Sequence, residues 1–456
     1  MKIAIIGAGL AGLTAAYELR DHEVYVFEAA GRIGGKLHTV PFNDGPTDMG
    51  AEAFVARRSD AVAFFEDLGL GDKLVTPSGL RPRVYTGGEL HFLPQGGVMG
   101  IPGEPQDFFS AATNEKIANE KPFTWEIGGD VSVGQLVRQQ YGDDVVDHVV
   151  SALLGGVYSC SADDLGLRAT VPQLAAALDT LAADGEVTLS AAVEAVAAGR
   201  KSGPADGPVF ATFAGGYASL YEALAEKSGA QIHLDTFISG ITAEGDTFHV
   251  QGAPKDLGTF DRVLVTTPAP TSARLLTKVA PSAAEELKKI KLASSAVVGF
   301  NFESNTDPEG NSIPEATGIL VAADEPGLHA KAFTLSSNKW PHLGERPGFI
   351  VRASFGRFGD DEITRAEEDD LVDYALDDLK KITGFDARAT GVSEIYTQRW
   401  FGGIPRYNET HLDTVARVHD ALANVEGLDA TGAWADGVGV PAVIAAARKS
   451  AAALVE

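Results

Sequence analysis

The start of the chain carries a clear hydrophobic pattern. Residues 1–6 are apolar apart from Lys2, which predicts a buried parallel strand over 2–6. After a glycine-rich loop, residues 13–19 have the composition of a helix, and residues 23–28 are rich in β-branched and aromatic side chains and end in an acid. Together these segments predict a βαβ unit of about 30 residues.

The same pattern of short apolar runs separated by turns or helical stretches continues along the chain. Residues 59–68 and most of 106–199 read as helical, with helix starts near Ser132 and Asp163, and residues 442–454 read as a C-terminal helix. A hairpin is expected at 85–91, and a loop at 199–208, which is rich in Gly, Pro, Ser and Asp. Further strands are expected at 231–234, 237–241, 247–251, 261–267, 294–303, 348–357 and 428–432.

These elements predict an α/β protein built on a discontinuous Rossmann-like dinucleotide-binding domain, with a β-sheet substrate domain and a helical subdomain. We assign residues 1–56, 206–270 and 399–456 to the dinucleotide-binding domain, because strands and glycine turns recur there. The substrate domain comprises 57–105 and 271–398, and the helical subdomain comprises 106–205.

The loop after the first strand has the spacing Gly-x-Gly-x-x-Gly at residues 7–12. Gly7 permits the tight turn, Gly9 lets the backbone approach a pyrophosphate, and Gly12 lets the helix pack on the strand. The free amides of the helix start then point at the phosphates. Glu28 lies 16 residues beyond Gly12, where a carboxylate accepts hydrogen bonds from ribose hydroxyls. The expected cofactor contacts here are Gly7, Ala8, Gly9, Leu10, Ala11, Gly12, Glu28 and Ala29.

The next segment, Gly31-Arg32-Ile33-Gly34-Gly35-Lys36, resembles the Gly-Arg-x-Gly-Gly segment of amine-oxidase-like flavoproteins, which implies FAD rather than NAD. Gly35 lets the backbone pass close to the cofactor, and Arg32 or Lys36 is placed to meet its phosphates. The alternative for these two cations is a solvated basic pair. The resemblance also implies that Gly50, Ala51, Glu52 and Ala53 pass beside the isoalloxazine.

Near the C-terminus, a strand ending at Gly432 is followed by Asp436-Gly437-Val438-Gly439-Val440-Pro441 and a helix. Pro441 suits a first helical turn, and the open amides before it give a positive helix end. The resemblance implies that Gly432 contacts the cofactor and that this helix end, with Val438, Gly439 and Val440, faces the flavin pyrimidine. It also implies that the backbone at Ile238 meets the adenine and that Trp400 lies at the cofactor.

Composition narrows the function classes. The 456 residues include 37 Lys and Arg against 63 Asp and Glu, a formal charge of −26 that disfavours nucleic acid and anionic lipid as partners. The charge also serves solubility. Cys160 is the single cysteine, so neither an internal disulfide nor a cysteine metal cluster is expected, and we predict no metal. No secretory signal or apolar stretch of about 20 residues is seen. We therefore expect a cytoplasmic protein with no transmembrane segment and at most peripheral membrane contact.

Several further segments, taken in order, carry a second resemblance. They are Leu90–Pro94 with Met99–Pro102, Gly155–Ser159 with Leu167–Pro172, Lys339–Pro341, Val351–Arg357, and Arg399–Trp400 with Ile404–Leu412. The chain resembles, over nearly its whole length, the protoporphyrinogen and coproporphyrinogen oxidase family of heme biosynthesis. It departs from the family pattern at Arg406, at Glu409-Thr410 and at Tyr217, which places details of the substrate pocket in doubt.

This resemblance implies a six-electron oxidation of a porphyrinogen in three hydride transfers to flavin, with molecular oxygen as acceptor and hydrogen peroxide released. The lack of a membrane span, the acidic surface and the segment Val98–Pro102 favour coproporphyrinogen III. A transient contact with the next heme-pathway enzyme would pass on the product. The alternatives are a protoporphyrinogen IX oxidase, an amine oxidase or desaturase of the same superfamily, and a non-catalytic porphyrin-binding flavoprotein.

No catalytic acid or base is evident in the sequence. The propionates of such a substrate need cations, and Arg81, Arg83 and Arg168 are candidates, although Arg168 lies in an apolar run and suits a structural ion pair equally well. For His91 and His411, structural hydrogen bonding is the favoured interpretation.

Overall fold

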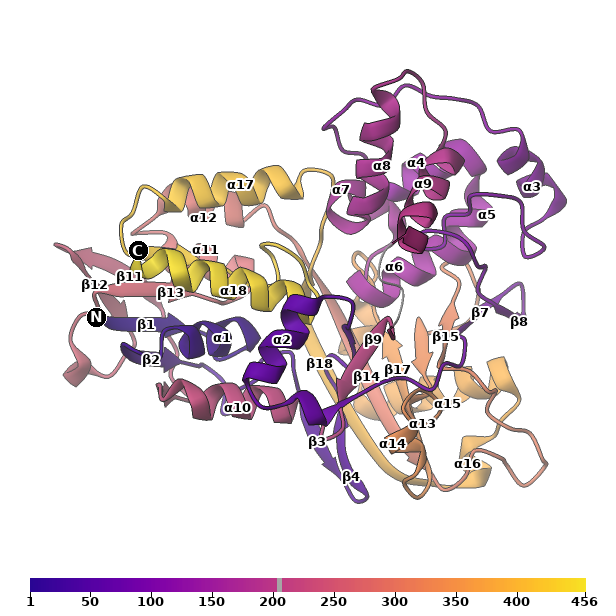
Figure 1. The fold of residues 1–456 in the computed structure, drawn as a ribbon. Coiled ribbons are helices and arrows are strands. Elements are labelled where there is room, and N and C mark those ends of the chain that lie inside the picture. The colour runs from indigo at the N-terminus through magenta and orange to yellow at the C-terminus, as the bar shows by residue number, and fades with distance from the viewer. Residues whose placement is uncertain (203–206) are drawn as a thin grey trace. The chain divides into compact units, whose positions relative to one another are not determined.

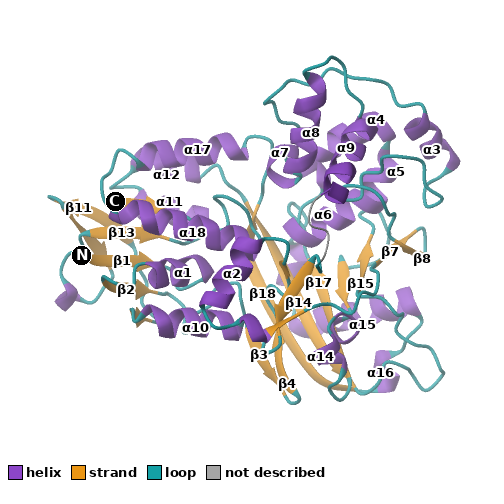
Figure 2. Ribbon diagram, in the orientation of Figure 1, coloured by secondary structure: helices purple, strands orange, loops and turns teal. Residues whose placement is uncertain are grey.

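The computed structural model describes residues 1–202 and 207–456, and its chain divides into two compact units. The first unit comprises Met1–Thr76, Gly207–Leu292 and Leu412–Glu456, and the second comprises Pro77–Asp206 and Ala293–His411. Each unit combines a sheet with helices (Figures 1 and 2), which confirms the predicted α/β class.

A five-stranded parallel sheet organises the first unit. Its central strand β1 pairs with β2 on one side and β13 on the other, so that Ile6 lies beside both Phe27 and Val265. The chain therefore changes direction along the sheet at β1, and ligands of such sheets bind outside the carboxyl ends of the strands at this switch. In order, the strands are β10 (Gln231–His233), β2 (Glu23–Phe27), β1 (Lys2–Ile6), β13 (Arg262–Val265) and β19 (Leu428–Ala430).

The alternation of side chains along β1 produces two cores in the first unit. Ile3 and Ile5 face a core shared with α1 (Leu10–Glu18), α2 (Ser59–Asp67), α10 (Ala218–Ser228) and α18 (Val440–Val455). Ala4 and Ile6 face the opposite core, shared with α11 (Ala269–Leu276), α12 (Pro281–Leu287) and α17 (His411–Leu422). The smaller strands of the unit are β3 (Thr39–Phe42), β4 (Gly45–Asp48), β5 (Phe54–Val55), β6 (Leu74–Val75), β9 (Phe210–Phe213), β11 (Gly240–Glu244) and β12 (Thr247–Gln251).

A seven-stranded sheet organises the second unit, antiparallel except where β15 runs parallel to β7. Helix α15 (Glu368–Thr383) covers it, burying Leu371, Ala375 and Leu379 against the strands. In order, the strands are β18 (Val392–Pro405), β14 (Leu292–Phe302), β17 (Phe349–Phe355), β16 (Ala332–Thr334), β15 (Gly318–Val321), β7 (Arg83–Thr86) and β8 (Glu89–Phe92). Three short helices accompany it: α13 (Ser336–Lys339), α14 (Pro341–Gly344) and α16 (Ala387–Thr390).

The segment between β8 and β9 is largely helical, as its sequence predicts. Ser132 caps the start of α4, its side chain accepting a hydrogen bond from the Gln135 amide at 3.2 Å. The start expected near Asp163 is a short 3₁₀ turn, Ala162–Asp164, and the helix itself begins at Leu167. The helices are α3 (Ala111–Ala118), α4 (Val133–Tyr141), α5 (Asp143–Val145), α6 (Ser151–Tyr158), α7 (Leu167–Thr170), α8 (Pro172–Ala182) and α9 (Leu189–Ser202).

Some element bounds differ from the sequence prediction. Helix α1 begins at Leu10 rather than residue 13, because the end of the glycine loop is already helical. The strand expected at 237–241 begins only at Gly240, so Ile238 lies in the preceding loop. Of the loop expected at 199–208, residues 199–202 continue α9, and residues 203–206 lie outside the described residues.

Three boundaries between the two units also differ from the domain boundaries expected from the sequence. Residues 57–76 lie in the first unit, where Phe64 and Phe65 of α2 join the core with α1. Residues 271–292 also lie there, because α11 and α12 pack on the parallel sheet. Residues 399–411 lie in the second unit, since 399–405 continue the long strand β18.

Candidate dinucleotide site

The glycine loop leaves β1 through a turn that only glycine fits. Gly7 has φ +110°, and its amide donates to the Phe27 carbonyl at 2.8 Å. A Cβ on Gly12 would lie 1.9 Å from the Gly7 carbonyl oxygen, so α1 starts in direct contact with the turn. Thr266, at the end of β13, places its Oγ1 2.9 Å from the Ile6 carbonyl oxygen and 3.0 Å from that of Gly7. The sequence analysis missed Thr266, although its place after an apolar strand marks the sheet edge where the loop lies.

The first turn of α1 is open to a ligand. Gly9 is its N-cap, no side chain caps it, and no acid lies in the first turn. The amides of Leu10, Ala11 and Gly12 precede the first intrahelical hydrogen bond, in which the Leu13 amide donates to the Gly9 carbonyl. A Cβ on Gly9 would meet only the Gly35 Cα, at 3.8 Å, so protein packing does not require this glycine. Free amides with space in front of them suit the phosphates of a dinucleotide.

The second glycine segment lies directly against the first. The Gly34 amide donates to the Ala8 carbonyl at 2.8 Å, and a Cβ on Gly35, whose φ is +57°, would lie 2.9 Å from the Gly9 Cα. The structure therefore brings together the two motifs that predicted the cofactor.

The two cations of this segment differ in their surroundings. Arg32 donates to the carbonyls of Ile33, Gly35 and Leu37 at 3.1, 2.6 and 3.2 Å. These hydrogen bonds stabilise its own loop, whereas the sequence predicted that Arg32 or Lys36 would bind the phosphates. The Lys36 ammonium has no hydrogen bond or ion pair with any described residue, and burial lowers its pKa to about 8. A desolvated ammonium without an anion fits a phosphate, so Lys36 remains a predicted contact.

Glu28 joins the two loops at the end of β2. Its Oε2 accepts from the Ala8 amide and its Oε1 from the Ala30 amide, each at 2.8 Å. Each carboxylate oxygen keeps a further lone pair, so the ribose contact predicted for Glu28 is compatible with both bonds. Ala29 lies between the two anchored positions.

The segment predicted beside the isoalloxazine is anchored by its first residues. A Cβ on Gly50 would lie 2.0 Å from the Lys36 carbonyl oxygen, which accepts from the Ala51 amide at 3.3 Å. Asp48 accepts from the Tyr217 amide at 3.1 Å and so fixes the start of α10. These contacts place Gly50 and Ala51 beside the second glycine segment, and the predicted contacts Glu52 and Ala53 follow them in the chain. Nothing near Asp48 in sequence reveals its partner Tyr217, 169 residues away.

The C-terminal residues enter the same unit from the other side of β1. The Thr431 amide donates to the Val265 carbonyl at 2.9 Å, which sets Gly432 at the end of the sheet. Helix α18 starts after Gly439, again without a side-chain cap or an acid in its first turn, and with Pro441 in that turn. Its predicted cofactor residues Val438, Gly439 and Val440, like Ile238, belong to the first unit, whereas Trp400 lies on β18 of the second.

The predicted substrate arginines lie in the second unit. Arg81 and Arg83 both stack on the Phe92 ring, with guanidinium carbons 4.7 and 4.3 Å from its centroid. Arg81 also donates to the Leu93 carbonyl at 2.9 Å. The structure thus brings two of the three candidates to one aromatic ring.

Arg168 does not join them, and the structure gives it a structural role. Its guanidinium donates to both carboxylate oxygens of Asp179, at 2.8 and 2.9 Å, and to the Gly129 carbonyl. The Trp125 indole also donates to Asp179, at 2.8 Å. These donors, Arg168 first, hold the pKa of Asp179 well below its ordinary value. The donors of Arg168 are therefore used within the helical segment.

The two histidines pack against aromatic rings, which suits the structural role predicted for them. His91 packs edge-on against Phe108, and buried His411 stacks on Tyr407 with ring centroids 3.8 Å apart. Across residues 1–202 and 207–456, no three His, Cys, Asp or Glu side chains are grouped so as to hold a metal ion. No helix in these ranges combines the length and apolar character needed to cross a membrane.

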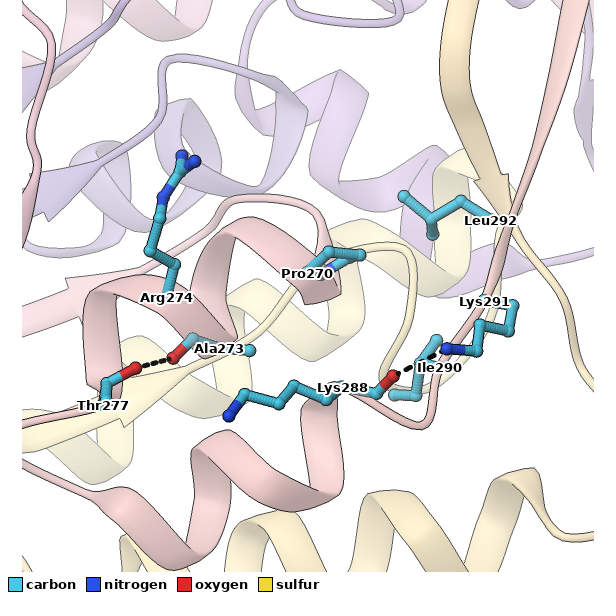
Figure 3. A pocket seen from close by; sticks show the side chains of 8 residues that line it. All are labelled: Pro270, Ala273, Arg274, Thr277, Lys288, Ile290, Lys291 and Leu292. Atoms are coloured by element: carbon cyan, nitrogen blue, oxygen red, sulfur yellow. Dashed lines mark hydrogen bonds between the residues drawn. The ribbon is translucent and has the colours of Figure 1, made fainter.

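A pocket of about 520 Å³ lies elsewhere in the first unit, between α11 and the chain that follows α12 (Figure 3). Arg274, Lys288 and Lys291 line it together with apolar residues such as Pro270 and Ile290. Since α11 packs on the sheet face opposite α1, this pocket is separate from the glycine loops.

The fold and the glycine-lined site define a dinucleotide-binding α/β protein. The family model for flavin containing amine oxidoreductases matches residues 10–455. The chain is 37% identical to coproporphyrinogen III oxidase of Mycobacterium tuberculosis (strain ATCC 25618 / H37Rv), over 99% of this chain and 97% of the relative. It is 28% identical to coproporphyrinogen III oxidase of Bacillus subtilis (strain 168), over 96% and 94%. A crystal structure from Exiguobacterium sp. 255-15, provisionally named a protoporphyrinogen oxidase, superposes with a TM-score of 0.84 at 28% identity, covering 99% and 97%.

The chain belongs to the family of flavin containing amine oxidoreductases. This confirms the predicted enzyme class, an oxidoreductase, and the predicted flavin. A flavin bound at a dinucleotide site is FAD, and the uncapped start of α1, the space before Gly9 and the unpaired Lys36 fit its diphosphate.

Proposed function

We propose that this protein oxidises coproporphyrinogen III to coproporphyrin III, with FAD as cofactor and molecular oxygen as acceptor. The observation that carries the proposal is the 37% identity to a relative of that name over 99% of the chain. The reaction balances as one porphyrinogen and three O₂ giving one porphyrin and three H₂O₂, six electrons in three steps. FAD, when bound, supplies the hydride acceptor.

The residues of the first unit have the task of holding the cofactor. The α1 amides and Lys36 would bind the diphosphate and Glu28 the ribose, while the uncapped start of α18 would face the flavin pyrimidine. A positive helix end near the pyrimidine stabilises negative charge there and so makes the cofactor a stronger oxidant.

Residues of the second unit would orient the substrate. Arg81 and Arg83 keep their guanidinium groups on the Phe92 ring, so both cations are held in place by one side chain. Guanidinium groups bind carboxylates with two parallel hydrogen bonds, which suits propionate arms. No described residue is assigned as a catalytic acid or base.

The test is oxygen-dependent turnover by the purified, FAD-loaded protein. Coproporphyrinogen III should yield fluorescent coproporphyrin and one equivalent of peroxide for each oxygen consumed. The matched control is Lys380→Gln, which removes an exposed lysine on α15 that is paired with Asp386 at 2.6 Å, and its rate should equal that of the wild type.

Side-by-side rates decide among the alternatives. Faster turnover of protoporphyrinogen IX would identify that compound as the substrate, and turnover of a primary amine alone would point to an amine oxidase. Porphyrin binding with no oxygen uptake would indicate a carrier. The cytoplasm as location, and a transient contact with the next heme-pathway enzyme, belong to the same proposal; cell fractionation and cross-linking test them.

A further inference from the structure

Among the described residues, the hydrogen-bond partners of one buried lysine in the second unit are all neutral. Lys331 lies just before β16, and 6% of its surface is exposed. Its ammonium donates to the Ser159 hydroxyl at 2.6 Å and to the Gly356 carbonyl at 2.7 Å. An ammonium has three donors, so one N–H remains after these two bonds.

A second cation lies beside it. Arg357 follows Gly356, and its Nε is buried without an acceptor among the described residues. One terminal nitrogen donates to the Val321 carbonyl at 3.3 Å, a long hydrogen bond. Helix α6 closes over this group, since a Cβ on Gly155 would lie 3.9 Å from the Arg357 Nε. Arg357 as a whole keeps part of its surface exposed, although its Nε is buried.

The acids nearby do not neutralise these two charges. Asp164 is paired with Arg406 at 3.3 Å, and Asp360, which is exposed, attracts Arg357 without forming an ion pair. Burial raises the pKa of Cys160 to about 12, so its thiol is neutral. Burial first, and then Arg357, lowers the pKa of Lys331 to about 7. Two cations out of water with no anion are unfavourable by themselves, and an incoming anion relieves this.

The backbone holds the third member of the cluster in an uncommon conformation. Ser159 ends α6 with φ +52°, in the left-handed region, and its carbonyl accepts from the Phe358 amide at 2.6 Å. Its hydroxyl accepts from Lys331 and keeps its own hydrogen to donate. Three segments far apart in sequence thus converge with donors left over.

We propose that Lys331, Arg357 and Ser159 bind a carboxylate group of the ligand. The carboxylate would accept from the remaining Lys331 N–H, the Ser159 hydroxyl and the Arg357 guanidinium. Its assignment to a propionate arm rests on the proposed function, since a porphyrinogen with propionates is the substrate inferred above. The site would add to Arg81 and Arg83 in selecting a substrate with several carboxylates.

The test measures binding of coproporphyrin III by fluorescence titration of the FAD-loaded protein, with its tetramethyl ester as the uncharged probe. Arg357→Gln and Lys331→Met should each raise the Kd of coproporphyrin III by at least about tenfold and leave that of the ester unchanged. Lys331→Arg, which keeps the charge, should recover part of the affinity. Ser159→Gly should fold, because glycine accepts the left-handed conformation, and should weaken binding less than loss of a cation. Lys380→Gln is the control for loss of a charge elsewhere in the unit.

Circular dichroism and flavin absorbance establish that each variant is folded and loaded. Folded Arg357→Gln and Ser159→Gly proteins with the wild-type Kd for coproporphyrin III would overturn the carboxylate site, as would an equal loss of affinity for the ester. If the variants keep the wild-type Kd and the wild type turns over coproporphyrinogen III, the proposed function is supported and only the carboxylate site is wrong. If the wild type shows no turnover but the variants lose coproporphyrin binding selectively, the site stands and the function falls.

Discussion

The Ala8 amide donates to the Glu28 carboxylate across a distance of 2.8 Å, linking the glycine loop after β1 to the end of β2. The other carboxylate oxygen holds the Ala30 amide at the same distance. Both loops that would face the cofactor are thus fixed by one side chain. Such preorganisation lowers the entropy cost of binding.

Replacing Glu28 by Ala should lower FAD affinity by at least about tenfold, because it frees two amides and removes the predicted ribose acceptor. The ratio of flavin absorbance to protein absorbance after gel filtration measures this. Glu23→Ala is the control, since Glu23 lies at the exposed start of the same strand and its carboxylate accepts from the Tyr25 hydroxyl. Full FAD retention by Glu28→Ala would remove Glu28 from the cofactor site.

Two glycines of one loop should respond differently to the same added methyl group. Gly12→Ala would place a Cβ 1.9 Å from the Gly7 carbonyl, so we expect it to lower the free energy of unfolding by about 3 kcal/mol or more. In Gly9→Ala the Cβ meets no protein atom closer than 3.8 Å, so the apoprotein should keep its stability while FAD affinity falls. Denaturant unfolding of the apoproteins and FAD titration separate the effects. Equal stability losses in both variants would contradict this assignment.

The Arg168–Asp179 pair should stabilise the helical segment rather than the substrate. Asp179→Asn should lower the free energy of unfolding by about 2 kcal/mol at pH 7, because it removes a charge-assisted pair at a mostly buried site. The folded pKa of Asp179 lies below its ordinary value of 3.8, so the stabilisation is present above that value and is lost as the pH falls below it. The difference between wild type and variant should therefore shrink toward pH 3. Asp60→Asn, in an exposed pair with Arg58, should have almost no effect.

Lys331 should give the ligand-free protein a stability that rises with pH. Its folded pKa of about 7 lies below the ordinary 10.5, so between these values the unfolded chain binds more protons and unfolding becomes less favourable as the pH increases. Relative to Lys331→Met, the wild type should gain up to about 4 kcal/mol from pH 7 to pH 10. Urea unfolding at several pH values measures this, with Lys380→Met as the control that should track the wild type. A constant difference between wild type and Lys331→Met would show that the ammonium keeps its ordinary pKa.

The sequence predicted the parts of the site that depend on local geometry. Gly7, Gly9 and Gly12 sit in a turn whose spacing alone defines their tasks, and Glu28 follows at a fixed distance because a helix and a strand lie between. Helix α4 was predicted from Ser132 because capping involves only the next few residues.

The remainder depends on pairs that are distant in sequence. Asp48 holds an amide 169 residues away, Thr266 supports a turn 259 residues before it, and Lys331 reaches a hydroxyl 172 residues before it. No local pattern encodes such partners. Arg32 shows a second limit, because a motif indicates where a cation lies but not whether backbone carbonyls already occupy its donors.

Helix α18 packs on α1, so the first unit joins segments that are synthesised early and late. Arg448 donates to Glu18 across 430 residues of chain, and β19 completes the sheet that β1 begins. Because ribosomes deliver the chain from its N-terminal side, the nascent dinucleotide fold lacks part of its sheet and helix layer until residues 428–455 have been synthesised. Cofactor loading into the complete site accordingly follows the synthesis of α18, and until then the apolar faces of β1 and α1 that pack against it are uncovered.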